Sequence, residues 1–88
     1  MEWSVYIAKC NDNSLYTGIT KDIRRREWEH NNDNQLGAKS LRGKRPVQIV
    51  YTEPFQTQSE AAKREKAIKN RTRQYKLELI EKIKQVKS

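Results

Sequence analysis

Apolar and polar residues alternate in two runs near the start of the chain, and this alternation predicts two β-strands. Trp3, Val5 and Ile7 share one side of the first run, and Leu15 and Ile19 share one side of the second. A polar Asn-Asp-Asn-Ser segment of the kind that forms turns separates the two runs. The pattern therefore predicts an antiparallel hairpin with one apolar side.

The apolar side also predicts how the two strands pair. Burying these side chains together requires Val5 to lie opposite Ile19, because a slip of one residue would turn one apolar set toward solvent. Tyr6 then lies opposite Gly18, and Tyr16 becomes its diagonal neighbour, about 7 to 8 Å away at the backbone. The apolar pattern alone therefore predicts two phenols side by side on the second face.

Turn residues and helical spacing predict the rest of the chain. A helix is expected from Asp22 to about Asn32, followed by a loop or short helical turn over residues 37–45. A strand over residues 47–51, closed by Pro54, comes next. Two helices complete the chain, from Ser59 to about Arg71 and from about Arg73 to Lys87, the second with Leu77, Ile80 and Ile83 at helical spacing. Together they predict an α+β fold, a small three-stranded sheet flanked by helices. We expect one domain over residues 1–88, since a chain of this length has room for one small core.

Charge narrows the choice of partner. The formal net charge is +8, from 19 Lys and Arg against 11 Asp and Glu, which favours a polyanion and nucleic acid in particular. No segment has the long apolar run or the broad apolar face that a membrane would require, and no signal peptide is visible. We therefore expect a cytoplasmic monomer. Its one cysteine, Cys10, is expected to be a small buried residue.

Two features of the predicted helices suggest chemistry. Arg26 and His30 are four residues apart, so one anionic group could touch both. Glu65 lies on the apolar stripe of its helix, where a carboxylate is costly unless it is paired or binds a metal. A partly exposed ion pair with Lys69, one turn further, accounts for Glu65 about as well.

These residues resemble the two motifs that define the GIY-YIG nuclease superfamily. Tyr6 matches the tyrosine that ends the first tripeptide, whose first two positions, here Ser4 and Val5, depart from the family pattern. Tyr16 and Gly18 match the second tripeptide, which departs at its middle threonine. The departures fall on backbone or packing positions, so they remove no catalytic group.

The resemblance continues beyond the two motifs. Arg26 follows Tyr16 by ten residues and His30 follows Arg26 by four, which is the family's spacing, and Glu65 matches its metal-binding glutamate. Residues 37–39, 45–47 and 64–69 are similar to a small stand-alone bacterial branch of the superfamily.

The resemblance implies an endonuclease, a metal-dependent phosphodiester hydrolase. Tyr6 would act as general base or orient the attacking water, Arg26 would hold the scissile phosphate, and Glu65 would bind one Mg²⁺ or Mn²⁺. Tyr16 and His30 would assist. DNA is favoured over RNA as the substrate, with repair or recombination as the candidate setting. The expected nucleic-acid contacts are Arg26, Lys39, Arg42, Lys44, Arg45 and Lys69.

Each of these residues also has a structural explanation. The tyrosines could be ordinary cross-strand aromatics, and His30 could interact with the negative end of its helix. A catalytically silent nucleic-acid-binding module with the same fold is therefore the alternative function. For Trp28, core or rim packing is favoured over stacking on a base.

Overall fold

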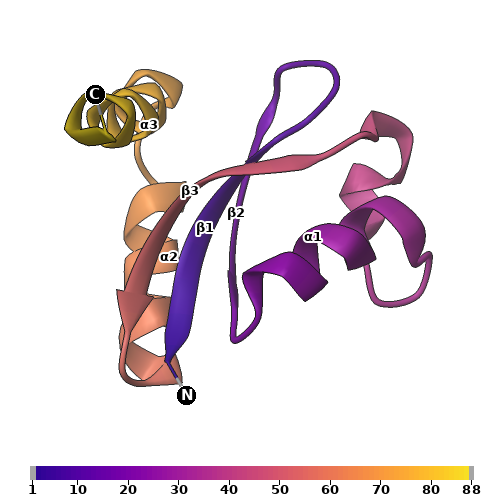
Figure 1. Ribbon diagram of the computed structural model, residues 1–88, viewed down its shortest axis with the longest axis horizontal. Helices are drawn as coiled ribbons and strands as arrows, with labels where there is room; N and C mark the ends of the chain where they lie inside the picture. Colours follow the sequence, from indigo (N-terminus) through magenta and orange to yellow (C-terminus); the bar gives the residue numbers. More distant parts are fainter. Residues whose placement is uncertain (1, 88) are drawn as a thin grey trace.

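The chain folds as a three-stranded antiparallel sheet with helices on both faces (Figure 1). The structure is a computed structural model that describes residues 2–87, with side chains described through residue 82. Its elements are β1 (Trp3–Lys9), β2 (Leu15–Thr20), α1 (Ile23–Asn32), the 3₁₀ helix η1 (Lys39–Lys44), β3 (Gln48–Phe55), α2 (Gln58–Lys69) and α3 (Arg73–Lys87). The strand order is β2-β1-β3, so β1 is central. The predicted α+β class is confirmed.

The hairpin has the register that the apolar pattern predicts. Val5 pairs with Ile19, and Tyr6 pairs with Gly18. The pairing of β1 with β3 contains an irregularity between Ile7 and Ala8, a feature that side-chain alternation does not reveal. The alternation of side chains along each strand therefore determines which residues of β1 and β2 face each layer of helices.

The third strand is longer than the sequence suggested, because Pro54 does not end it. β3 continues through Pro54, whose Cα partner on β1 is Ser4, to Phe55. β3 is an edge strand, and an edge can accommodate a residue without a backbone N–H. The expectation that Pro54 closes the strand was therefore wrong.

The start of α2 also differs from the expected position. Ser59 is not the cap; Thr57 is, and its Oγ1 accepts the backbone N–H of Glu60 at 3.2 Å. Glu60 completes the capping box by accepting the Thr57 backbone N–H through Oε1 at 3.2 Å. The bounds of α1 and α3 agree with those expected, and the polar segment between α1 and β3 contains η1.

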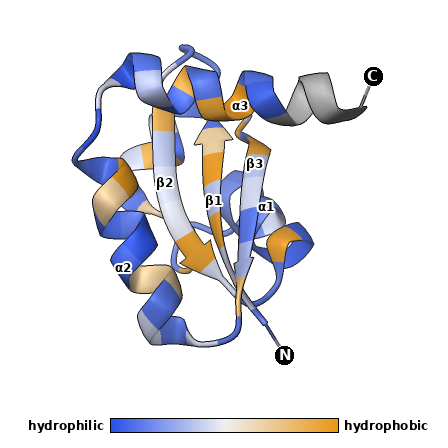
Figure 2. Cartoon of the chain, turned by 90° about the vertical axis from the view of Figure 1, so that its left-hand side faces the viewer, coloured by the Kyte–Doolittle hydropathy of each residue, from blue (hydrophilic) through white to orange (hydrophobic). Residues whose placement is uncertain are grey.

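Two apolar clusters lie on the two faces of the sheet. Val5 and Ile7 face α2 and α3, in a cluster that also contains Tyr51, Ala61, Ile68 and Ile80. Tyr6 faces the side of α1 and η1, in a cluster that also contains Ala8, Cys10, Leu41 and Val47. Figure 2 shows apolar residues concentrated along the central strand β1. The helices α1 and α2 therefore cover opposite faces.

The remaining sequence expectations concern single residues. Cys10 is buried, as expected, and Ile80 is buried at the inner side of α3, whereas Ile83 lies outside the described side chains. Within the described residues, none of the helices has the length and apolar character needed to cross a membrane.

Candidate active site

Three rings from three different elements meet on the α1 face of the sheet. Tyr6 comes from β1, Tyr16 from β2 and His30 from α1. The ring centroid of Tyr6 lies 6.2 Å from that of Tyr16 and 5.8 Å from that of His30, and Tyr16 lies 5.4 Å from His30. The hairpin register brings the two phenols together, and α1 adds the imidazole.

Tyr6 reaches over the edge strand because its partner there is a glycine. A Cβ atom on Gly18 would lie 2.5 Å from Oη of Tyr6 and 2.7 Å from Cζ, which is closer than atoms can pack. The phenol therefore lies directly on the backbone of β2 and points toward that edge of the sheet. Gly18 is needed here for close approach.

The hydrogen bonds of His30 define its tautomer. Nδ1 accepts the backbone N–H of Ala38 at 3.3 Å, so the ring proton of the neutral form resides on Nε2. Nε2 lies 2.7 Å from Oη of Tyr6 and donates to it. The phenol oxygen is thus an acceptor from His30, and the phenol's own proton is available to a different partner.

His30 is held neutral by its surroundings. Burial lowers the pKa of His30 from 6.5 to about 4, and the positive charges of Arg26 and Arg45 act in the same direction. Glu29 acts in the opposite direction but does not compensate. The side chain is fully buried. At pH 7 His30 is therefore a neutral donor to Tyr6.

Tyr6 is a weaker acid than a free phenol. Burial raises the pKa of Tyr6 to about 12, Arg26 lowers it, and the charges of Tyr16 and Glu65 raise it again. Burial therefore outweighs the effect of the Arg26 cation on this pKa. In the free protein Tyr6 is accordingly a neutral phenol near pH 7.

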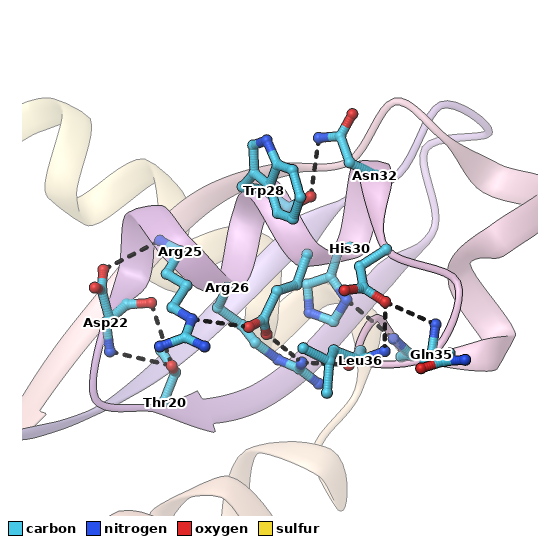
Figure 3. Close-up of polar contacts among 12 residues, drawn as sticks. Thr20, Asp22, Arg25, Arg26, Trp28, His30, Asn32, Gln35 and Leu36 are labelled. Carbon is cyan, nitrogen blue, oxygen red and sulfur yellow. Dashed lines mark hydrogen bonds and ion pairs between the residues drawn. The ribbon is translucent and has the colours of Figure 1, made fainter.

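Arg26 is positioned by two partners that the sequence reasoning missed (Figure 3). Its Nη1 donates to Oε1 of Glu29 at 2.9 Å and to the backbone oxygen of Leu36 at 2.6 Å. Glu29 also accepts from Nε of Arg25 at 3.1 Å. The spacing of Glu29, three residues after Arg26 and four after Arg25, is the signal in the sequence that could have revealed these pairs.

The loop that carries Leu36 and Ala38 packs tightly against α1. A Cβ on Gly37 would lie 2.5 Å from the backbone oxygen of Glu29 and 2.7 Å from that of Asp33. This close approach places the Ala38 N–H beside His30 and the Leu36 carbonyl beside Arg26.

Glu65 approaches the site from the opposite face of the sheet. Its side chain on α2 is 23% exposed, and Oε2 lies 3.4 Å from Nζ of Lys69, so the ion pair considered from the sequence is present. Its charge nevertheless reaches Tyr6, because Glu65 raises the pKa of that phenol.

The described residues offer a metal ion few side-chain ligands. Within the described part of the chain, no group of three or more His, Cys, Asp and Glu side chains could hold an ion. A single partly exposed carboxylate fits Mg²⁺ or Mn²⁺, since Mg²⁺ keeps several waters and takes further oxygens from substrate phosphate. Glu65 is the residue that would hold it.

The expected nucleic-acid contacts do not form one uniform set. Lys39 and Arg42 are exposed on η1, although Arg42 also donates to the backbone oxygen of Asn34. Nζ of Lys44 lies 3.8 Å from Oδ2 of Asp12, and Nε of Arg45 donates to the backbone oxygen of His30 at 2.7 Å. The structure therefore leaves Lys39 and Arg42 more accessible than Arg45, which supports the end of α1.

The expectation that Trp28 packs in the core or at its rim was wrong. Its side chain is 59% exposed, and it projects from the side of α1 opposite Arg26 (Figure 3). Helical spacing places Trp28 and His30 on different sides of α1, but the sequence does not show which segments cover each side.

Comparison with known proteins places these features in a family. The family described as the GIY-YIG catalytic domain matches residues 2–78. A UPF0213 protein of Staphylococcus saprophyticus is 57% identical over 76 residues, covering 86% of this chain and 90% of that protein. A UPF0213 protein of Staphylococcus epidermidis is 54% identical over 77 residues, covering 88% and 92% respectively.

A solved structure shows the same similarity. The solution NMR structure of a UPF0213 protein from Bacillus halodurans matches with a TM-score of 0.57 and 38% sequence identity, and the match covers 92% of this chain and 84% of that one. The similarity therefore spans both faces of the sheet.

Proposed function

Because the chain belongs to the GIY-YIG catalytic domain family, we propose that it is a metal-dependent endonuclease that hydrolyses phosphodiester bonds in nucleic acid, with DNA as the favoured substrate. The observation that carries this proposal is the set of groups around Oη of Tyr6. His30 donates to that oxygen, and the charges of Arg26 and Glu65 both act on it. Family membership indicates the nuclease superfamily, and this cluster supports hydrolysis in particular.

Arg26 is the residue proposed to hold the scissile phosphate. A guanidinium can bind two phosphate oxygens at once and stabilise the charge that develops on them. Its bonds to Glu29 and to the Leu36 backbone fix its direction before substrate arrives. This preorganisation reduces the cost of ordering a long side chain during binding.

Tyr6 is proposed to orient the attacking water. As a neutral phenol that accepts from His30, it can donate its own proton in a hydrogen bond to a water oxygen and so hold that water in position. To act as a general base, Tyr6 would first have to lose its proton to solvent, and nearby positive charge favours that loss by lowering the pKa of the phenol. Glu65 would hold a divalent ion, which would supply Lewis-acid stabilisation of charge on the phosphate.

The function is tested by metal-dependent cleavage with the Glu65→Gln variant. This change keeps the shape of the side chain and removes its charge, so we expect an intact fold, equal or slightly tighter nucleic-acid binding, and a loss of cleavage by orders of magnitude. Glu78→Gln, on the exposed side of α3, is the matched control that removes one negative charge elsewhere. It should cleave at the wild-type rate.

A silent binding module is the second candidate, and the ion pair between Glu65 and Lys69 favours it. If Glu65 serves only that pair, Glu65→Gln should lower stability by at most about 1 kcal/mol and leave any cleavage unchanged. Wild-type rates in this variant would remove Glu65 from the site. Binding by the parent protein without cleavage of any DNA or RNA would support the silent module.

A further inference from the structure

The outer side of α1 exposes one aromatic side chain, Trp28, that the proposed site does not use. Trp28 and Leu36 are the large apolar side chains most exposed among the described residues, at 59% and 54%. Single exposed apolar residues are common on proteins, so exposure alone does not indicate a binding surface. The charges around Trp28 distinguish it.

The exposed charge next to Trp28 is positive. Arg24 and Arg25 precede it by four and three residues and so lie on the same side of α1, and the Arg25 side chain is 71% exposed. The acidic neighbours are turned away or paired. Glu27 accepts a hydrogen bond from the backbone N–H of Ile49 at 2.7 Å. The side chain of Glu29 is 12% exposed and forms ion pairs with Arg25 and Arg26.

Three consecutive arginines connect this side of the helix with the candidate active site. Arg24, Arg25 and Arg26 are each turned by about 100° from the next, so their guanidinium groups spread around α1 from the Trp28 side to the Tyr6 side. Figure 3 shows Arg26 on the side of Leu36 and Trp28 on the opposite side. A polyanion bound at Arg26 can therefore continue past Arg25 to the indole.

We infer that Trp28 is a stacking platform for a base of single-stranded nucleic acid whose backbone passes from Arg26 across Arg25. This inference rests on the nucleic-acid substrate of the proposed function and names its class. The strand must turn around a helix about 10 to 12 Å wide, which a single strand can do. A duplex, stiff over about 150 base pairs, cannot, and its stacked bases present no open face to an indole.

Tryptophan fluorescence tests this inference directly, because the chain has only two tryptophans. Trp3 is half-buried at the start of β1 beneath Lys21, and Trp3→Phe keeps an aromatic ring there while leaving Trp28 as the sole reporter. The probe is an oligothymidylate of about 12 nucleotides, titrated without divalent metal so that nothing is cut. We expect strong quenching by this strand and little by a blunt duplex of the same length.

Substitutions at Trp28 separate stacking from charge. Trp28→Ala should weaken oligothymidylate binding roughly 5- to 150-fold, and Trp28→Leu, which keeps apolar bulk without a π-face, should recover little of that affinity. Both should leave the dependence of affinity on salt unchanged, since stacking releases no counterions. Arg25→Ala should instead lower the slope of log affinity against log salt by about 0.7.

The outcomes distinguish this inference from the proposed function. Quenching and a weaker-binding Trp28→Ala variant without any cleavage would support the stacking platform and count against the nuclease. Cleavage by a protein whose Trp28 fluorescence does not respond to saturating oligothymidylate would overturn the platform and leave the nuclease standing. Equal affinity of Trp28→Ala and wild type, or no binding of the oligonucleotide, would also overturn the platform.

Discussion

At the scale of single residues, the site depends on a histidine that the fold keeps neutral. A second proton on His30 would have to go on Nδ1, which accepts the N–H of Ala38, and two donors would then face each other. Arg26 and Arg45 lie close enough to oppose the added charge, and Glu29 favours it without compensating for them. Protonation therefore disrupts the folded state at the point where α1 meets the loop that follows it.

The first prediction is a loss of stability in mild acid. Unfolded His30 binds a proton near pH 6.5, whereas the folded pKa is lowered to about 4, so falling pH favours the unfolded chain between these values. We expect the free energy of unfolding to fall by roughly 2 to 3 kcal/mol from pH 7 to pH 4, measured by urea denaturation.

The control for this prediction is His30→Gln, which removes the titrating group. The lowered pKa values of Asp12, Asp33 and Glu53 also cost stability in acid, but only below their ordinary values near 4. The variant should therefore show a nearly flat stability profile between about pH 6.5 and 4.5. A profile identical to that of the parent would assign the acid sensitivity to other groups.

At the scale of elements, the alternation of apolar and polar side chains was the most informative feature of the sequence for strand pairing. It was sufficient to place Tyr6 beside Tyr16, because the buried apolar side permits one register. The ends of strands were harder to predict, since Pro54 is tolerated within β3 only because β3 is an edge strand. The exposure of a helical side chain was harder still to predict, because the environment of Trp28 depends on which segments of the chain pack against α1. Tertiary placement, which one sequence does not contain, decides these cases.

The second prediction concerns the close approach of β1 to β2. Gly18→Ala places a methyl group 2.5 Å from Oη of Tyr6, which must then move and break its bond to His30. We expect a decrease of about 1 to 3 kcal/mol in unfolding free energy, as for other overpacked sites. Tyr6→Phe removes the nearest atom, so the double variant should be destabilised by less than the sum of the two single variants.

Gly43→Ala is the matched control for that experiment. Apart from its chain neighbours and the backbone of its own helix, no described atom lies within 4 Å of its added Cβ, and no positive φ restricts the residue. The stability of the Gly43→Ala protein should therefore be unchanged or slightly higher. Equal stability of the Gly18→Ala and Gly43→Ala proteins would contradict the close approach of the phenol to β2.

At the scale of the whole molecule, the charge is less freely available than the total of +8 suggests. Several cations of the C-terminal half hold the fold together. Arg64 donates to both carboxylate oxygens of Glu53, at 2.9 and 3.0 Å, and Arg73 donates to the backbone oxygen of Asn13 at 2.8 Å. On η1, Lys39 and Arg42 are exposed, so we expect the phosphate-binding surface to include that helix.

The third prediction is a change in salt dependence. Replacing Lys39 and Arg42 with Ala should lower the slope of log affinity against log salt by about 0.7 to 0.9 for each phosphate that is no longer neutralised, with little dependence on sequence. Arg45→Ala should mainly lower stability, because Arg45 binds the end of α1. Lys82→Ala, on an exposed part of α3, is the control and should leave the slope unchanged. An unaltered slope in the double variant would place the binding surface elsewhere.

Because α1 and α2 pack on opposite faces of one sheet, either helix could detach without the other. Transient detachment of either helix would separate the groups around Tyr6 while the three strands remained paired, so the site should be lost through sub-global opening. Amide hydrogen exchange would detect such openings in α1 or α2 at lower free energy than in β1. In rising denaturant, the cleavage rate should then decline before the far-ultraviolet circular dichroism signal of the sheet does.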